Sequence, residues 1–295
     1  MSDGRYLVIS ADDFGRSSSI NLAVATAFGR GLLTSASIVA GGEAFEEAAG
    51  LAVRSPRLSV GLHVTLSDGR PVLPRAAVPD LVDDDGCFAR KPLRAGIAYW
   101  RLRRSVGDQI ESEVRAQFDK AEAAGIHPTH VDCHHHLHIH PVLFEIIARE
   151  AAKRGAAWIR IPREPLPFLL RLHGPRFDGR AFAAWLVFGL LARRCLRIAG
   201  RYGLRVLDNV YGLSGTGRID EEYLLALLPR VRGETNEIYV HPDMASVQGL
   251  AEMKAVASRR VKDTLKALGF VLVGFRELSD RPAGLRLAAE GAAKT

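Results

Sequence analysis

Side chains that can bind a metal or transfer a proton stand at four widely separated places in this sequence. Asp12 and Asp13 follow a short apolar run, His63 lies late in a second run, and His241 ends a third. The fourth place is residues 130–141, HVDCHHHLHIHP. If the fold brings these places together, their side chains can form one polar site.

The histidine cluster is the strongest of these signals. Seven of the ten histidines of the chain lie between positions 127 and 140, although histidine is uncommon in protein cores. The cluster indicates metal binding, but the residues alone do not choose among its members. The candidates that directly follow the strand-like VDC run are His134, His135, His136 and His138.

These residue types suit hydrolysis assisted by a metal ion. Two histidines and one aspartate can hold a divalent cation and leave coordination positions open for water and substrate. Such a cation lowers the pKa of water, to about 7 for zinc, and a nearby carboxylate can then accept the proton. The sequence offers Asp13, His63 and His134 as ligands, Asp12 as general base and His241 as general acid. Imidazole ligands favour zinc or a similar transition metal, and magnesium less so.

Each place also has a purely structural interpretation. An Asp-Asp pair after a strand is typical of a turn or a helix N-cap. His63 could be a core histidine with its hydrogen bonds satisfied, and His241 could simply end a strand before Pro242. Cys133 is best interpreted as a small packed thiol, because no serine, histidine and aspartate order or glycine elbow accompanies it.

Apolar runs that alternate with helical patterns set the expected fold. Strand-like runs lie at 6–10, 34–42, 58–66, 127–135, 157–162, 236–242 and 270–275. Helical patterns lie at 19–30, 43–54, 107–125, 141–155 and 250–268. This alternation predicts an α/β fold with a mostly parallel sheet. The carboxyl ends of parallel strands meet at one rim, so the four polar places are expected to converge there.

Length and composition suggest one globular unit. The chain has 295 residues, 47% hydrophobic and 25% charged. We expect one domain over residues 1–280, with inserted segments near 68–106 and 165–207, and a flexible tail at 281–295. Three distant cysteines form no disulfide framework, which indicates a reducing compartment. The absence of a signal-peptide pattern and of an apolar run of about 20 residues predicts a cytoplasmic protein without a membrane span.

The net charge of +7 is concentrated in one inserted segment. Between residues 165 and 207, arginines surround the apolar run FAAWLVFGLLA at 182–192, and Asp178 is the only acidic residue. A basic helix with an apolar face can lie in a bilayer interface, which suggests peripheral association with the inner membrane. The alternative is a barrel helix with a solvated arginine face. Nucleic acid is not an expected partner, because no aromatic stacking platform accompanies the charge.

Five motifs resemble those of the YdjC-like carbohydrate deacetylase family, which includes chitooligosaccharide deacetylases. They are SADDFG (10–15), LLTSASIVAGG (32–42), VGLHVTLSDGRPVLP (60–74), PTHVDCHHHLHIHP (128–141) and YVHPD (239–243). The resemblance implies a distorted (β/α) TIM-like barrel, one divalent metal and hydrolysis of an N-acetyl group on an amino sugar. It implies Asp13, His63 and His134 as ligands, Asp12 as base and His241 as acid.

Further residues near these motifs are candidates for supporting the ligands or contacting substrate. They are Asp132, His136, His138, Arg163 and Asp243. Two positions depart from the family pattern. Asp243 stands where many relatives have glycine, and Cys133 stands where serine or alanine is frequent. Both departures could reshape the pocket without removing a ligand.

Three shorter matches are similar to the hopanoid-biosynthesis-associated branch of that family, HpnK. They are GRPVLP (69–74), VPDLVDDDGCF (78–88) and IRIPREP (159–165). This similarity implies a lipid-linked substrate, the N-acetylglucosaminyl group of bacteriohopanetetrol. The alternatives are a chitooligosaccharide deacetylase, a phosphoesterase or other amidohydrolase on the same barrel, and a non-catalytic membrane-associated scaffold.

Overall fold

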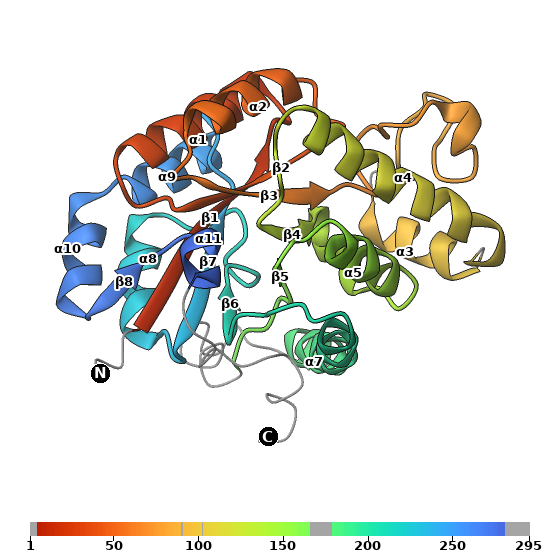
Figure 1. Ribbon diagram of the computed structural model, residues 1–295. Coiled ribbons are helices and arrows are strands. Elements are labelled where there is room, and N and C mark those ends of the chain that lie inside the picture. Colours follow the sequence, from red (N-terminus) through yellow and green to blue (C-terminus); the bar gives the residue numbers. More distant parts are fainter. Residues whose placement is uncertain (1–4, 90, 102, 166–178, 281–295) are drawn as a thin grey trace.

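The computed structural model describes residues 5–89, 91–101, 103–165 and 179–280 (Figure 1). Its strands are β1 (Arg5–Phe14), β2 (Ser35–Ile38), β3 (Ser59–Val64), β4 (His130–Cys133), β5 (Trp158–Ile159), β6 (Asn209–Tyr211), β7 (Thr235–Val240) and β8 (Phe270–Leu272). Its α-helices are α1 (Ser18–Gly29), α2 (Phe45–Arg54), α3 (Pro92–Arg101), α4 (Arg103–Ala123), α5 (Leu143–Lys153), α7 (Gly179–Arg201), α8 (Glu221–Leu227), α9 (Val247–Val256), α10 (Arg259–Ala267) and α11 (Phe275–Ser279). The short 3₁₀ helices are η1 (Arg75–Ala77), η2 (His134–Ile139) and η4 (Leu228–Arg230).

Within these ranges the strands form one parallel sheet in the order β5-β4-β3-β2-β1-β7-β6, and β8 pairs with the start of β1. The predicted α/β fold with a parallel sheet is therefore confirmed. Asp12 and Asp13 lie near the carboxyl end of β1, His63 near that of β3, and His241 directly after β7. The strand ends therefore bring the predicted polar residues to one rim.

The sheet curls, and backbone hydrogen bonds join its two ends. The N–H of Ile159 in β5 donates to the carbonyl of Arg205, 3.0 Å away, and the N–H of Arg205 donates to Ala157, 2.9 Å away. Further along, the N–H of Val210 in β6 donates to the carbonyl of Arg163 at 3.3 Å. The helices lie around the outside of the curled sheet (Figure 1). This arrangement is a distorted barrel.

Apolar residues at helical spacing hold the helices on the sheet. In α4, the buried residues Val106, Ile110, Val114 and Phe118 recur every four positions, which places them on one side of the helix. Each large side chain removed from water stabilises the fold by about 1.5–3 kcal/mol relative to leaving it exposed.

The first predicted insertion, 68–106, carries η1 and α3 and leads into α4. A buried carboxylate ties it to the barrel, because Glu113 of α4 accepts the backbone N–H groups of Val72 and Leu73 at 2.8 and 3.0 Å. The second insertion, 165–207, contains α7, although residues 166–178 lie outside the described residues. The predicted tail, 281–295, lies outside them as well.

The expectation of one helix over 250–268 was wrong. Two helices, α9 and α10, occupy this stretch, and Ser258 separates them. The Ser258 hydroxyl accepts the N–H of Val261 at 3.3 Å, so it caps the start of α10. Serine at such a position competes with the helix backbone for hydrogen bonds, which explains the break.

Candidate active site

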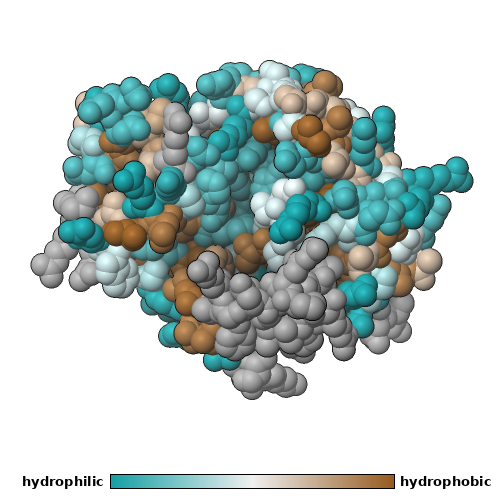
Figure 2. Space-filling model, turned by 180° about the vertical axis from the view of Figure 1, so that it is seen from behind, coloured by the Kyte–Doolittle hydropathy of each residue, from teal (hydrophilic) through white to brown (hydrophobic). Residues whose placement is uncertain are grey.

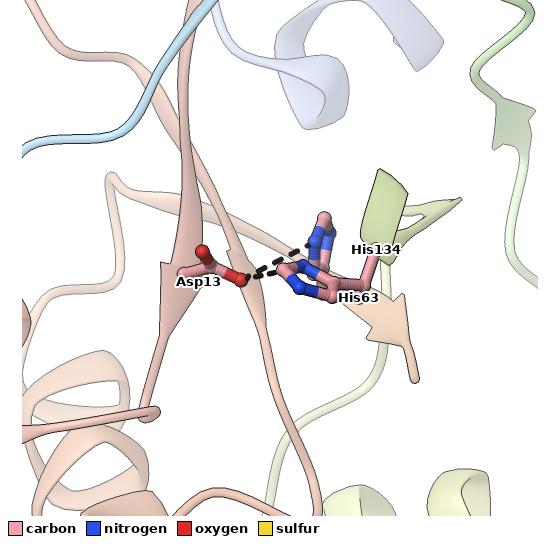
Figure 3. A group of neighbouring side chains, drawn as sticks. All are labelled: Asp13, His63 and His134. Carbon is pink, nitrogen blue, oxygen red and sulfur yellow. Dashed lines mark ion pairs between the residues drawn. The ribbon is translucent and has the colours of Figure 1, made fainter. Parts of the chain in front are cut away.

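The three predicted ligands lie together at the rim of the barrel (Figure 3). Oδ1 of Asp13 is 3.0 Å from Nδ1 of His134 and 3.6 Å from Nε2 of His63. All three side chains are almost fully buried. They come from β1, from β3, which β2 separates from β1 in the sheet, and from the first residue of η2, directly after β4.

This cluster fits a divalent cation. The three ligand atoms lie within 4.8 Å of one another, and a tetrahedral site with bonds of about 2.0–2.1 Å requires ligand atoms roughly 3.3 Å apart. Oδ1 of Asp13 is buried and forms no hydrogen bond with any described residue. Its near neighbours are the ring nitrogens of His134 and His63, and a cation among these three atoms would satisfy the buried oxygen.

Ionisation also suits Asp13 to this role. Burial alone would raise its pKa, but the short contact with His134 and the nearby rings of His63 and His241 hold the pKa well below its usual range. The carboxylate is therefore ionised at neutral pH.

A second carboxylate fixes the orientation of His63. Its Nδ1 lies 2.7 Å from Oδ1 of Asp132, so its Nε2 points toward Asp13. Burial would lower the pKa of His63, but the charge and hydrogen bond of Asp132 raise it to about 9. A carboxylate behind a ligand histidine is the usual way in which proteins orient such a ligand and increase its basicity. Asp132 was predicted as a possible supporting or substrate-binding residue, and the structure places it against Nδ1 of His63.

The backbone around the cluster adopts an unusual conformation. Among the described residues, the non-glycine positions with positive φ are Asp13, Asp68, His135 and His136. Such conformations cost about 1–3 kcal/mol each and collect at functional sites. At Asp13 the register between β1 and β2 also shifts. At this irregularity of β1 the carboxylate of Asp13 faces the two histidines.

Asp12 belongs to a buried charged network centred on Arg160. The Arg160 guanidinium donates to both carboxylate oxygens of Asp12, at 2.7 and 2.8 Å. It also lies 2.8 Å from Asp132 and 2.7 Å from Glu237. Arg160 therefore joins the predicted base to the carboxylate that orients His63.

Sequence reasoning missed Arg160, although a signal was present. It is the single charged residue in the apolar run AWIRIP, and a buried arginine needs carboxylate partners. Arg163, which was chosen instead, donates to the backbone carbonyl of Asp208 at 2.5 Å and has no described contact with the ligand cluster.

His241 lies across a pocket from the two aspartates. Its backbone N–H donates to Glu252 of α9 at 2.6 Å, while its buried Nδ1 has no hydrogen-bond partner in the described part of the chain. The residues that line the pocket are Asp12, Asp13, Arg16, Ile20, His241, Pro242, Asp243 and Ser246. Asp243, predicted as a substrate contact, is thus at the pocket wall.

The other histidines of the cluster differ in their surroundings. Nε2 of His136 lies 2.8 Å from the hydroxyl of Tyr239, and Nε2 of His138 lies 2.6 Å from the carbonyl of Arg160. Burial lowers the pKa of His136 well below its ordinary value and that of His138 to about 4, so both rings are neutral. They lie beside the Arg160 network rather than among the three ligands.

Arg16 and Asp68 also contact the ligand cluster, and sequence reasoning did not select them. Nη1 of Arg16 lies 2.9 Å from Nε2 of His134, and its Nη2 lies 2.8 Å from Asp68. Asp68 forms a second group with His134 and His135. Because the Arg16 guanidinium already neutralises Asp68, this group is a poor place for a second cation.

Comparisons with known proteins identify the family of this chain. A family model described as YdjC-like protein matches residues 6–267. A carbohydrate deacetylase of Brevibacillus brevis is 41% identical over 145 residues, which are 49% of this chain and 55% of that protein. A chitooligosaccharide deacetylase of Salmonella typhimurium is 36% identical over 164 residues, 54% of this chain and 60% of that protein. The chain thus matches a little over half the length of these relatives.

One solved structure shares the fold over nearly the whole chain. It is a protein of Enterococcus faecalis V583 proposed to cleave cellobiose phosphate. The TM-score is 0.73 at 24% sequence identity, and the match covers 93% of this chain and 99% of the other. This likeness supports the TIM-like architecture of the distorted barrel.

Proposed function

This chain belongs to the YdjC-like family, and we propose that it hydrolyses the N-acetyl group of an acetylated amino sugar with the help of one divalent cation. The observation that carries the proposal is the convergence of Asp13, His63 and His134 beside a pocket that Asp12 and His241 also line. Relatives named as carbohydrate and chitooligosaccharide deacetylases support the choice of bond and substrate class.

Asp13, His63 and His134 would hold the cation, with zinc or a similar transition metal favoured by the imidazole ligands and magnesium as the alternative. When bound, such a cation polarises a carbonyl and makes water a stronger acid. The orientation of His63 by Asp132 supports this ligand set.

Asp12 and His241 would move the protons. The carboxylate of Asp12 accepts hydrogen bonds from Nη1 and Nη2 of Arg160. In the proposed reaction it accepts a proton from the attacking water, whose oxygen bonds to the acetyl carbon. His241 delivers a proton to the amide nitrogen as the C–N bond breaks, so that acetate and a free amine leave. General acid and base groups of this kind each contribute roughly 10²–10⁴-fold in rate.

The position of Arg16 favours this reaction over that of a two-metal phosphoesterase. Many phosphoesterases use two cations about 3.5–4 Å apart. The neighbouring group that contains Asp68 is already paired with the Arg16 guanidinium. The proposal therefore requires one metal per chain, which elemental analysis of the purified protein can measure.

For the substrate, we propose a lipid-linked amino sugar, specifically the N-acetylglucosaminyl group of a bacteriohopanetetrol lipid, deacetylated in the cytoplasm at the inner membrane. The short matches at 69–74, 78–88 and 159–165 support this choice. In the described part of the chain, none of the helices is long and apolar enough to cross a bilayer. A lipid-linked substrate would then require a surface that meets the membrane from one side.

The decisive experiment compares Asp12→Asn with Asp13→Asn. Both change one buried carboxylate to an amide of the same shape. We expect Asp12→Asn to keep its metal and to lose acetate release from N-acetylglucosaminyl hopanoid or chitobiose by about 10³-fold. Asp13→Asn should lose the metal itself. An active Asp12→Asn enzyme, or a wild type that releases phosphate but no acetate, would overturn the proposal.

A further inference from the structure

Two helices expose apolar side chains next to the candidate active site. On α3 the exposed fractions are 75% for Leu93, 51% for Ile97 and 50% for Trp100, and on α7 they are 47% for Leu186, 54% for Val187 and 57% for Leu190. The α3 residues recur at spacings of four and three, so they share one side of that helix. Exposed apolar residues are ordinary when scattered, but a gathered set marks an interaction surface.

Both helices pack on η2, the segment that begins with His134. The ring of Trp100 in α3 lies 6.1 Å from that of His140, and the charge of Arg194 in α7 acts on the same histidine. Cys195 of α7 faces the carbonyl of Ile139. The apolar surface is therefore continuous with the segment that carries a metal ligand. Figure 2 shows hydrophobic areas on the α3 and α7 side of the molecule, beside a hydrophilic hollow.

The helix α7 has features of both alternatives that its sequence suggested, a helix that packs in the barrel and a basic helix with an exposed apolar face. Ala192, Cys195 and Ala199 are buried, so one side of the helix packs in the protein. The exposed side runs through Leu186, Leu190, Arg193, Arg197 and Arg201, at spacings of three or four. It is apolar in its first half and cationic in its second.

The charged residues of α3 and of residues 186–201 of α7 are all basic. The exposed basic side chains are Lys91 directly before α3, Arg94 and Arg101 on α3, and Arg193, Arg197 and Arg201 on α7. Neither α3 nor residues 186–201 of α7 contain an acidic residue. On neighbouring helices, Glu145 of α5 pairs with Arg201, and α4, which packs on α3, carries Asp108 and Glu111. Such a surface complements an anionic one.

We propose that these exposed sides of α3 and α7 form one docking surface for an anionic lipid bilayer. Leu93, Ile97 and Trp100 enter the headgroup region together with Leu186, Val187 and Leu190, while the arginines contact lipid phosphates. Tryptophan suits this boundary because its ring is apolar and its N–H is polar. The proposal rests on the proposed function, because the surface would serve to present a lipid-linked sugar to the site beside η2.

Vesicle co-sedimentation tests the surface directly. We expect the full chain to bind phosphatidylcholine vesicles that contain phosphatidylglycerol, to bind vesicles without it weakly, and to lose binding as salt rises. Replacing Ile97 and Trp100 by serine, or Leu186 and Leu190 by serine, should lower the partition coefficient at least tenfold. Each change of Arg94, Arg193 or Arg197 to glutamine should lower it roughly fivefold.

Matched controls keep the test specific. Leu22 of α1 and Val53 of α2 are 57% and 59% exposed, on helices that lie away from α7 in Figure 1. Leu22→Ser, Val53→Ser and, for charge, Arg259→Gln on α10 should bind vesicles like the wild type. Urea unfolding of each variant identifies any that fail to fold, and these are replaced by the single substitutions Ile97→Ser and Leu190→Ser.

Two readouts separate this surface from the proposed chemistry. Acetate release from soluble chitobiose should be unchanged in the α3 and α7 variants, whereas release from a lipid-linked substrate in vesicles should fall about tenfold. Absent vesicle binding, or binding equal in wild type and both apolar variants, would overturn the docking surface. Vesicle binding without any acetate release would overturn the proposed function and leave the docking surface supported.

Discussion

The site has a ligand side, where His63 on β3 contacts Asp132 on β4, and a pocket side, where His241 follows β7, and the two hold their imidazoles differently. His63 is fixed through Nδ1 by Asp132, which in turn accepts hydrogen bonds from Ser37 and contacts Arg160. Nδ1 of His241 has no such partner among the described residues. A ligand must be held rigidly to select a cation, whereas a proton donor needs a free ring nitrogen for its substrate. The difference agrees with the proposed division of roles.

The strongest test of the rigid side is the removal of its central charge. Arg160→Met leaves Asp12, Asp132 and Glu237 as buried carboxylates without their counter-charge. We expect a loss of about 3–5 kcal/mol in the free energy of unfolding, measured by urea denaturation. Arg259→Met is the control, because the Arg259–Asp263 pair is exposed and is worth about 0–1 kcal/mol. Similar losses in both variants would mean that the buried network contributes no more to the free energy of unfolding than an exposed ion pair does.

The pocket side is tested by the change His241→Gln. We expect kcat to fall about 10²–10³-fold while metal content and the free energy of unfolding stay near those of the wild type. His127→Gln, at an exposed histidine, should leave kcat unchanged. Loss of metal from His241→Gln would assign this residue to the ligand side instead.

The support of His63 is tested by Asp132→Asn. An amide cannot increase the basicity of the ring as a carboxylate does, so we expect the metal affinity to fall about 10–100-fold. Competition with a metal chelator measures this affinity. Asp68→Asn, which changes a carboxylate already paired with Arg16, should alter the affinity much less. Equal losses of metal affinity in the two variants would mean that Asp132 supports the metal site no more than Asp68 does.

A last test concerns pH. Burial lowers the pKa of His130 to about 3, against 6.5 as its ordinary value. As pH falls below 6.5, the unfolded chain binds a proton at His130 and the folded protein does not, so stability falls until about pH 3. We expect His130→Gln to reduce the slope of unfolding free energy against pH by about 1.4 kcal/mol per unit between pH 6 and 4. Parallel curves for wild type and variant would contradict this.

Sequence patterns predicted the parallel fold and the meeting of Asp13, His63 and His134, because strand ends converge whatever the details of the loops. They could not predict the positive φ at His135 and His136, which depends on how η2 packs. The role of Arg160 was missed because its partners are carboxylates on other strands, and the sequence alone does not show that those strands surround it. The three-residue strand β6 was also missed, since a run that short has no measurable periodicity.

Gly61 in β3 shows that the geometry of the site also depends on residues that take no part in catalysis or metal binding. A Cβ atom at Gly61 would clash with the ring of His130. That ring shares the Ser37 hydroxyl with Asp132, which orients His63. A single methyl group at position 61 would therefore displace the ring of His130 and disturb the relay of contacts that runs from His130 through Ser37 and Asp132 to His63. Tolerance to mutation in this barrel should follow that relay rather than distance from the pocket.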